Sequence, residues 1–328
     1  MTVPKMTLGQ KAVKSAQVVE RTLENRPVFA MLIIGTALLF ASLLFLNFLS
    51  ASPNMSHGLF NHSISGVSSM YPLNITPAGW AFSIWGVIYL LQLSWILYSL
   101  ALICRQTPEG PAYLNPMVLS PAFFIFFSLS SAFNISWLFL WDQLLFLASF
   151  IFLACIAVSL YLTVTIAANR VVLYRENLID NGRGCEVSFL QVAVVNGVSM
   201  YATWTTIATL INLGVVLVYK WSRPISNENA SIICLGILAV IAVVYVGLDI
   251  TVLERYTRYS VTPYLVVTWA LSAIIAKNWD PKNASSIIAA VLLGAFGLAS
   301  FMKVGLATYR GRSQAYQYRQ MKAGRPRP

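Results

Sequence analysis

The sequence predicts an all-α, polytopic transmembrane helix bundle, and three properties of the chain support this fold class. Charged residues make up only 10% of the chain, hydrophobic residues make up 58%, and the mean hydropathy is +0.70. Soluble domains, in contrast, carry about a quarter charged residues. The third property is a series of apolar runs long enough to cross a hydrocarbon core about 30 Å thick. These runs predict about eight spans, at residues 29–50, 79–103, 118–140, 144–168, 195–219, 231–252, 261–276 and 287–308.

The first span lies between a basic segment, residues 1–28, and the only sizeable outer loop, residues 51–77. Its apolar run is too long for the core of a signal peptide, so we interpret it as a signal anchor. The loop is rich in Ser, Asn and Gly, and we expect it to be loosely ordered unless it packs over the helices. It contains three sequons for N-glycosylation, at Asn54, Asn61 and Asn74.

The second and third spans each carry aromatic and amide side chains on one helical face. The second opens with Thr-Pro-Ala-Gly-Trp at residues 76–80, in which Pro and Gly suit a tight turn. Its face then carries Trp85, Tyr89 and Gln92, and the third span carries Asn134 and Trp137. Aromatic planes and a few amides suit a flat, mostly apolar ligand. The same residue types also join helices and anchor membrane interfaces, so a purely structural role stays open for each.

The fifth span carries a third polar stripe. Tyr201, Thr205, Ala208 and Asn212 fall on one helical face, with Trp204 on its flank. Asn and Trp have no reason to face lipid tails, so we expect this stripe to face other helices or an enclosed ligand. Apolar character begins before the span, and we interpret residues 187–196 as a cytoplasmic extension or interfacial piece. A ninth helix is the alternative.

The last three spans contain one carboxylate, Asp249, about a turn from the cytoplasmic end of its span. An intramembrane acid is a candidate functional group, here a coupling site for transport. The structural alternative, which we favour, is that Asp249 pairs with Arg255 or Arg258 or reaches the headgroups. The basic tail, residues 309–328, is expected to be disordered and to lie near anionic lipid headgroups.

The distribution of Lys and Arg predicts the orientation of the chain. With eight crossings and both ends inside, the outer loops hold four of the 22 Lys and Arg residues, namely Lys220, Arg223, Lys277 and Lys282. By the positive-inside rule both termini are therefore cytoplasmic, and the sequons of the outer loop agree. The net charge of +11 is thus a signal of topology. The lipid bilayer is the expected partner, and nucleic acid is not, because no nucleic-acid module accompanies the basic ends.

The motifs in these spans resemble those of the TspO/MBR family, the translocator proteins or tryptophan-rich sensory proteins. The order of the motifs and their assignment to the second, third and fifth helices match the family. They comprise Pro77, Gly79, Trp80, Phe82, Trp85 and Tyr89, then Asn134 and Trp137, then Tyr201, Trp204, Ala208, Thr209 and Asn212. The chain departs from the family pattern at the additional Ala78, at a shorter spacing from Phe82 to Trp85, and at Leu138, where the family has a Pro after the third-helix Trp.

The resemblance implies a five-helix membrane core at residues 29–220, followed by an additional three-helix membrane segment at 221–308 that short members lack. The family binds porphyrins and sterol-like ligands in a cavity between its helices. The resemblance therefore implies a hydrophobic planar ligand, either a tetrapyrrole or a sterol-like molecule. The residues that it implies for binding are Trp85, Tyr89, Gln92, Asn134, Trp137, Tyr201, Trp204 and Asn212. A porphyrin would be a ligand and not a resident cofactor, because the only histidines, His57 and His62, lie in the outer loop.

The expected function is the binding, sensing or translocation of that ligand, without catalysis. No catalytic triad, phosphate loop or zinc spacing occurs in the sequence. The alternatives are a secondary transporter of a small solute coupled through Asp249, and an enzyme that acts on the bound ligand. The sequons favour the plasma membrane or an endomembrane, whereas short animal members of the family are mitochondrial, so the mitochondrial outer membrane is the alternative location. Association into a homo-oligomer stays open.

Overall fold

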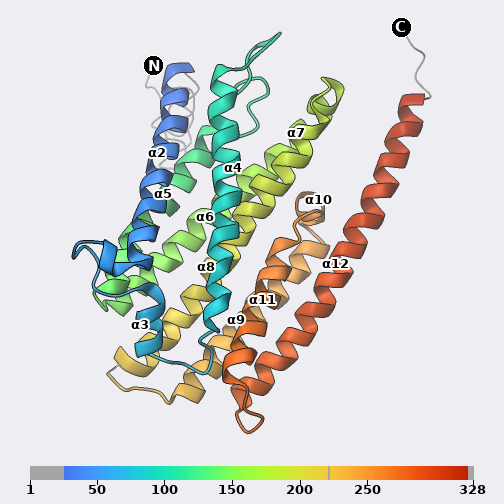
Figure 1. Ribbon diagram of the computed structural model, residues 1–328. Coiled ribbons are helices and arrows are strands. Elements are labelled where there is room, and N and C mark those ends of the chain that lie inside the picture. Colours follow the sequence, from blue (N-terminus) through green and yellow to red (C-terminus); the bar gives the residue numbers. More distant parts are fainter. Residues whose placement is uncertain (1–25, 221, 324–328) are drawn as a thin grey trace, which may run out of the picture.

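The computed structural model describes residues 26–220 and 222–323, and it is a bundle of long helices, as the sequence predicts (Figure 1). Seven helical stretches in these residues are long and apolar enough to cross a membrane. They contain α2 (Arg26–Ala51), η2 with α4 (Gly79–Cys104), α5 (Pro121–Asp142), α6 (Phe146–Asp180), α7 to η4 (Gly184–Lys220), α9 (Asn227–Ile250) and the first part of α12 (Ala284–Arg310). The chain is therefore an integral, multi-pass membrane protein.

The eighth expected span, residues 261–276, is helix α11 (Thr262–Asn278), which is shorter than the others. Its 17 residues reach about 26 Å, which is at the lower limit for crossing a bilayer. Pro263 in its first turn and the turn around Pro281 bound it on both sides. Length and composition thus identify seven spans where we expected about eight. Helix α2 nevertheless begins, and α12 ends, at the same end of the bundle (Figure 1).

Two helices extend beyond the spans that the sequence predicts. Helix α6 continues to Asp180, whereas we expected the fourth span to end at residue 168. Residues 187–196 continue the fifth span as one helix, which confirms the extension and excludes a ninth helix. This helix consists of α7 (Gly184–Phe189), the π-helical segment η3 (Leu190–Asn196), α8 (Gly197–Val215) and the π-helical segment η4 (Val216–Lys220).

The prediction of a disordered tail from residue 309 is wrong for most of that tail. Helix α12 (Ala284–Ala323) continues through it, because helix-favouring Arg, Gln, Lys, Ala and Met residues predominate at 312–323. Residues 324–328, and all but the last three residues of the basic segment 1–28, lie outside the described residues.

The outer loop is ordered and packs over one end of the bundle. It contains η1 (Pro53–Met55) and α3 (Ile64–Met70), and its Phe60 and Val67 are buried. The carboxylate of Asp142, at the end of α5, accepts the backbone N–H groups of Asn61 at 2.9 Å and His62 at 2.7 Å. These bonds fix the loop to the end of α5.

At the opposite end of the bundle, α4 and α5 are joined through a small antiparallel hairpin of β1 (Gln106–Thr107) and β2 (Gly110–Pro111).

Helix α8 packs against both groups of helices. It contacts α4 and α6 of a five-helix group (α2, α4, α5, α6, α8), and also α9 and α11 of a three-helix group (α9, α11, α12). The short helix α10 (Glu254–Thr257) connects α9 to α11. The turn that opens the second span, including η2 (Gly79–Ser83), is bonded to α11. There the Ala78 N–H donates to the Ala273 carbonyl at 3.0 Å, and Trp269 Nε1 donates to the Ala81 carbonyl at 3.1 Å.

Candidate functional site

Aromatic residues from α4 and α8 meet in the interior of the five-helix group. The ring of Trp85 stacks on Tyr89, with 5.3 Å between centroids, and meets the rings of Tyr201 and Trp204 edge-on at 5.7 and 6.4 Å. From α5, Asn134 Nδ2 donates a hydrogen bond of 2.6 Å to Tyr201 Oη. Five of the predicted site residues, from three helices, thus form one contact cluster, which we call the aromatic–amide cluster.

Buried polar atoms without partners concentrate among the predicted site residues. In the described part of the chain, five buried side-chain polar atoms have no hydrogen-bond partner. Four of them are Tyr89 Oη, Asn134 Oδ1, Trp137 Nε1 and Asn212 Oδ1, and the fifth is Gln191 Nε2. Such an atom costs about 1–3 kcal/mol of desolvation, so a group of them requires an explanation. Together they offer both donors and acceptors for hydrogen bonds.

The residues that carry these four atoms lie toward one end of the bundle. Tyr89 is five residues after the start of α4, Asn134 is eight residues before the end of α5, and Asn212 is three residues before the end of α8. With a rise of 1.5 Å per residue, each lies within about 12 Å of the end that the outer loop covers. Trp137 is closer to that end than Asn134, and its ring stacks on Trp141.

Two of the predicted residues also join helices directly. Gln92, fully buried, donates from Nε2 to the carbonyl of Gly197 at 3.0 Å and accepts from Trp95 Nε1 at 2.9 Å. Gly197 allows this approach because a Cβ there would lie 3.0 Å from the Cβ of Leu91. Asn212 Nδ2 donates to Ser149 Oγ of α6 at 2.9 Å. These bonds set the spacing of α8 from α4 and from α6.

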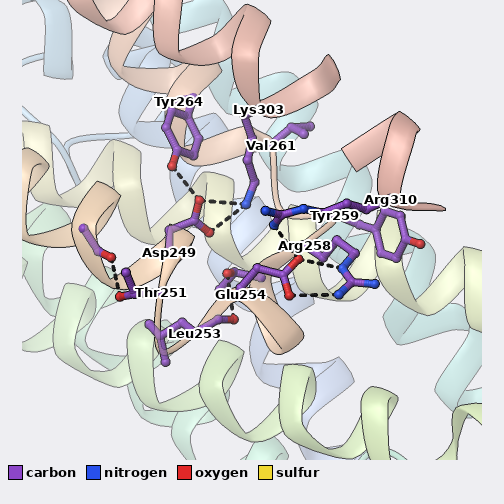
Figure 2. Close-up of polar contacts among 12 residues, drawn as sticks. Asp249, Thr251, Leu253, Glu254, Arg258, Tyr259, Val261, Tyr264, Lys303 and Arg310 are labelled. Carbon is purple, nitrogen blue, oxygen red and sulfur yellow. Dashed lines mark hydrogen bonds and ion pairs between the residues drawn. The ribbon is translucent and has the colours of Figure 1, made fainter. Parts of the chain in front are cut away.

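Asp249 lies in the three-helix group, where its side chain points toward Lys303 and Tyr264 (Figure 2). Its fully buried carboxylate accepts two bonds from Lys303 Nζ of α12, at 2.7 and 2.8 Å, and one from Tyr264 Oη of α11, at 2.5 Å. The expected pairing with Arg255 or Arg258 is wrong. Arg258 instead pairs with Glu254 at 2.7 Å. The sequence signal that we missed is Lys303, a basic residue inside the apolar run 287–308.

A large cavity lies on the other side of α8, and the sequence analysis did not predict it. It has a volume of about 650 Å³ and lies between α6 and α8 on one side and α9 to α12 on the other. None of the predicted site residues lines it. A signal for it exists in the sequence, because Tyr161, Thr165 and Asn169 recur at a spacing of four residues on one face of α6.

The three sequons differ in their surroundings. The Asn54 side chain is exposed. Asn61 is exposed too, although its Nδ2 lies 3.3 Å from an Asp142 carboxylate oxygen. Asn74 Nδ2, the atom to which a glycan would attach, donates to Glu228 at 2.7 Å, and Thr76 of the same sequon is buried. This arrangement favours Asn54 over Asn74 as an acceptor.

The family model described as TSPO-like protein matches residues 32–303, which is most of the chain. The match extends well beyond residues 29–220, for which the motifs predict a resemblance, and includes most of the three-helix group. No curated protein and no solved structure matches the chain.

Proposed function

The chain belongs to the TSPO-like protein family, and on that premise we propose that it binds a hydrophobic planar ligand at the aromatic–amide cluster. The observation that carries this proposal is the position of the unpartnered atoms. Four of the five in the described residues belong to residues that the sequence predicts for the site. Two of these four atoms, Tyr89 Oη and Asn134 Oδ1, belong to the cluster itself. A ligand with donors and acceptors at its edge would satisfy them, and the rings around it would stack on its faces.

The ligand class follows from the shape and polarity of the cluster. Trp85, Tyr89, Tyr201 and Trp204 offer flat apolar faces, which suit the planar ring of a tetrapyrrole. A sterol-like ligand is the second member of the class. In the structure these rings contact one another. Binding therefore requires the half-buried rings of Trp85 and Tyr89 to separate from those of Tyr201 and Trp204. Such a site binds, senses or passes on its ligand, and we assign no catalytic step to it.

The test is a fluorescence titration of the purified protein with protoporphyrin, repeated on cluster variants and matched controls. Asn134→Leu removes an unpartnered oxygen, and Trp204→Phe removes part of a stacking face. One lost hydrogen bond should weaken binding by about 2- to 12-fold. Asn47→Leu and Trp279→Phe are the controls, because Asn47 bonds its own helix at Leu43 and Trp279 is 53% exposed. Equal affinities in cluster and control variants of normal thermal stability would disprove the proposal.

A second candidate function rests on the buried ion pair between Asp249 and Lys303. Charged residues inside a membrane often belong to ion or proton pathways, so the three-helix group could couple solute transport to protonation. In that case Asp249→Asn should abolish pH-dependent uptake into proteoliposomes. If uptake by Asp249→Asn stays unchanged, the ion pair has only a structural role.

For the orientation in the membrane, we propose that both termini are cytoplasmic. The low number of Lys and Arg residues in the outer loops supports this, as does the position of the start of α2 and the end of α12 at one end of the bundle. The outer loop with its sequons then faces the lumen or the cell exterior, which favours an endomembrane or the plasma membrane. Cysteine labelling from each side of sealed vesicles, at an introduced Ser313→Cys, would test the cytoplasmic end of α12.

A further inference from the structure

The cavity that α6 and α8 form with α9 to α12, here called the α9 groove, is large enough for a small hydrophobic molecule. Its volume of about 650 Å³ is within the range of about 300–1,000 Å³ that is usual for ligand pockets. One wall is lipid-facing, because Val240 and Val244 line the groove and are 66% and 55% exposed. In a membrane these side chains lie against acyl chains, so a ligand can enter from the bilayer.

The lining of the groove excludes a charged ligand. Its 24 residues include no Asp, Glu, Lys, Arg or His. An ionised group in this low-dielectric environment would have no counter-charge and would cost several kcal/mol. The lining is mostly aliphatic, with hydroxyl-bearing residues concentrated on α6, α8 and the α10 region. The ligand must therefore be neutral, with an apolar body.

Three threonine hydroxyls on the α6 and α8 side of the groove indicate one group that a ligand can supply. Thr165, Thr203 and Thr206 donate their only hydroxyl hydrogens to backbone carbonyls four residues earlier, at 2.7 to 2.9 Å. Since Thr206 Oγ1 has no second hydrogen, the 3.1 Å bond to Tyr161 Oη requires Tyr161 to be the donor. These oxygens can then only accept further hydrogen bonds. They suit a ligand that donates from a hydroxyl of its own.

We propose that the α9 groove binds a neutral membrane lipid that carries a free hydroxyl group. This site is separate from the aromatic–amide cluster and does not depend on it. Sterols and diacylglycerols share this chemistry, whereas phosphatidylcholine has a charged headgroup and no hydroxyl donor. The proposal therefore predicts that both neutral lipids compete for the groove and that phosphatidylcholine does not.

The test uses photoreactive cholesterol and photoreactive diacylglycerol with the full-length protein in phosphatidylcholine nanodiscs. Val244→Trp places a large ring in the groove, at a lipid-facing position where it should not disturb folding. Val243→Trp is the matched control, because Val243 is 74% exposed and does not line the groove. We expect saturable labelling by at least one neutral lipid, lost in Val244→Trp and retained in Val243→Trp. Labelling by only one of the two probes would show whether the groove prefers a sterol or a diacylglycerol.

A second pair of variants tests the hydrogen bonds. Thr206→Val removes an acceptor from the groove, and Thr205→Val makes the same change at a buried residue of α8 that does not line it. Labelling should require about 2- to 12-fold more probe in Thr206→Val and be unchanged in Thr205→Val. Equal labelling of Val244→Trp and Val243→Trp would overturn the proposal. Competition by phosphatidylcholine as strong as that by the neutral lipids would also overturn the proposal. It would mean that the groove holds ordinary boundary lipid without selecting for a neutral lipid.

Discussion

The polar side chains on the two faces of α8 differ in their packing and in their hydrogen bonds. Toward the five-helix group, Tyr201 and Trp204 lie in tight contact with other rings, and nearby amide and hydroxyl atoms lack partners. Toward α9, the hydroxyls of Thr203 and Thr206 bond their own helix and line an open groove of about 650 Å³. Consecutive residues, Thr203 and Trp204, thus face different environments.

This difference shows where binding energy can come from on each face. At the aromatic–amide cluster, a ligand would gain by pairing atoms whose desolvation is already part of the folded state. At the α9 groove the hydroxyls of Thr165, Thr203 and Thr206 already bond their own helices, and a ligand would gain mainly by burying its apolar body, with one added hydrogen bond. We therefore expect substitutions of polar atoms to weaken binding more at the cluster, and blocking substitutions to be decisive at the groove.

The largest expected effect concerns the ion pair that joins α9 to α12. Lys303→Met leaves the fully buried Asp249 carboxylate with only Tyr264 as a partner. Breaking one side of a buried pair costs about 3–5 kcal/mol, so the free energy of unfolding should fall by about that amount. The melting temperature of the purified protein in detergent measures this loss. The aromatic–amide cluster has no such dependence on a single charge.

A double variant supplies the control for this prediction. Asp249→Asn combined with Lys303→Met removes both charges and should recover most of the lost stability. If the single and double variants melt at the same temperature, the damage comes from lost packing and not from an unpaired charge.

A smaller effect is expected from acid at the connection between α9 and α11. Hydrogen bonds from Arg258, with a further one from Arg310, lower the pKa of Glu254 to about 2. Because the folded pKa is below the unfolded value of about 4.3, this stabilisation is complete above about pH 4.3 and is lost as the pH falls toward 2. Glu254→Gln should therefore show a smaller drop in melting temperature between pH 7 and pH 3 than the unchanged protein.

The corresponding control is Glu176→Gln, which changes an exposed carboxylate of α6. Its acid sensitivity should equal that of the unchanged protein. An equal reduction in both variants would mean that the acid sensitivity does not arise from Glu254.

The smallest effect on stability is expected from removal of a glycan. Asn54→Gln should abolish a glycosidase-sensitive gel shift, because Asn54 is exposed in the outer loop. Asn74→Gln should leave the shift unchanged, since Asn74 Nδ2 is bonded to Glu228. A shift that depends on Asn74 would show that the outer loop is arranged differently during synthesis. The absence of any shift would favour a mitochondrial location.

The sequence predicts the helices well because apolar runs and motif order are local properties. The aromatic and amide residues of α4, α5 and α8 could be named in advance, since each occupies one face of its own helix. The partner of Asp249 could not, because pairing with Lys303 depends on how α9 and α12 pack, 54 residues apart. The α9 groove was missed for the same reason, since seven different elements form its walls.

One experiment tests most directly whether α8 separates two binding sites. It measures protoporphyrin binding and neutral-lipid photolabelling in both Trp204→Phe and Thr203→Val, which change neighbouring residues on different faces. We predict that Trp204→Phe weakens only protoporphyrin binding and that Thr203→Val weakens only lipid labelling. If either variant weakens both, or if neither weakens its own ligand, the two faces of α8 do not form two independent sites.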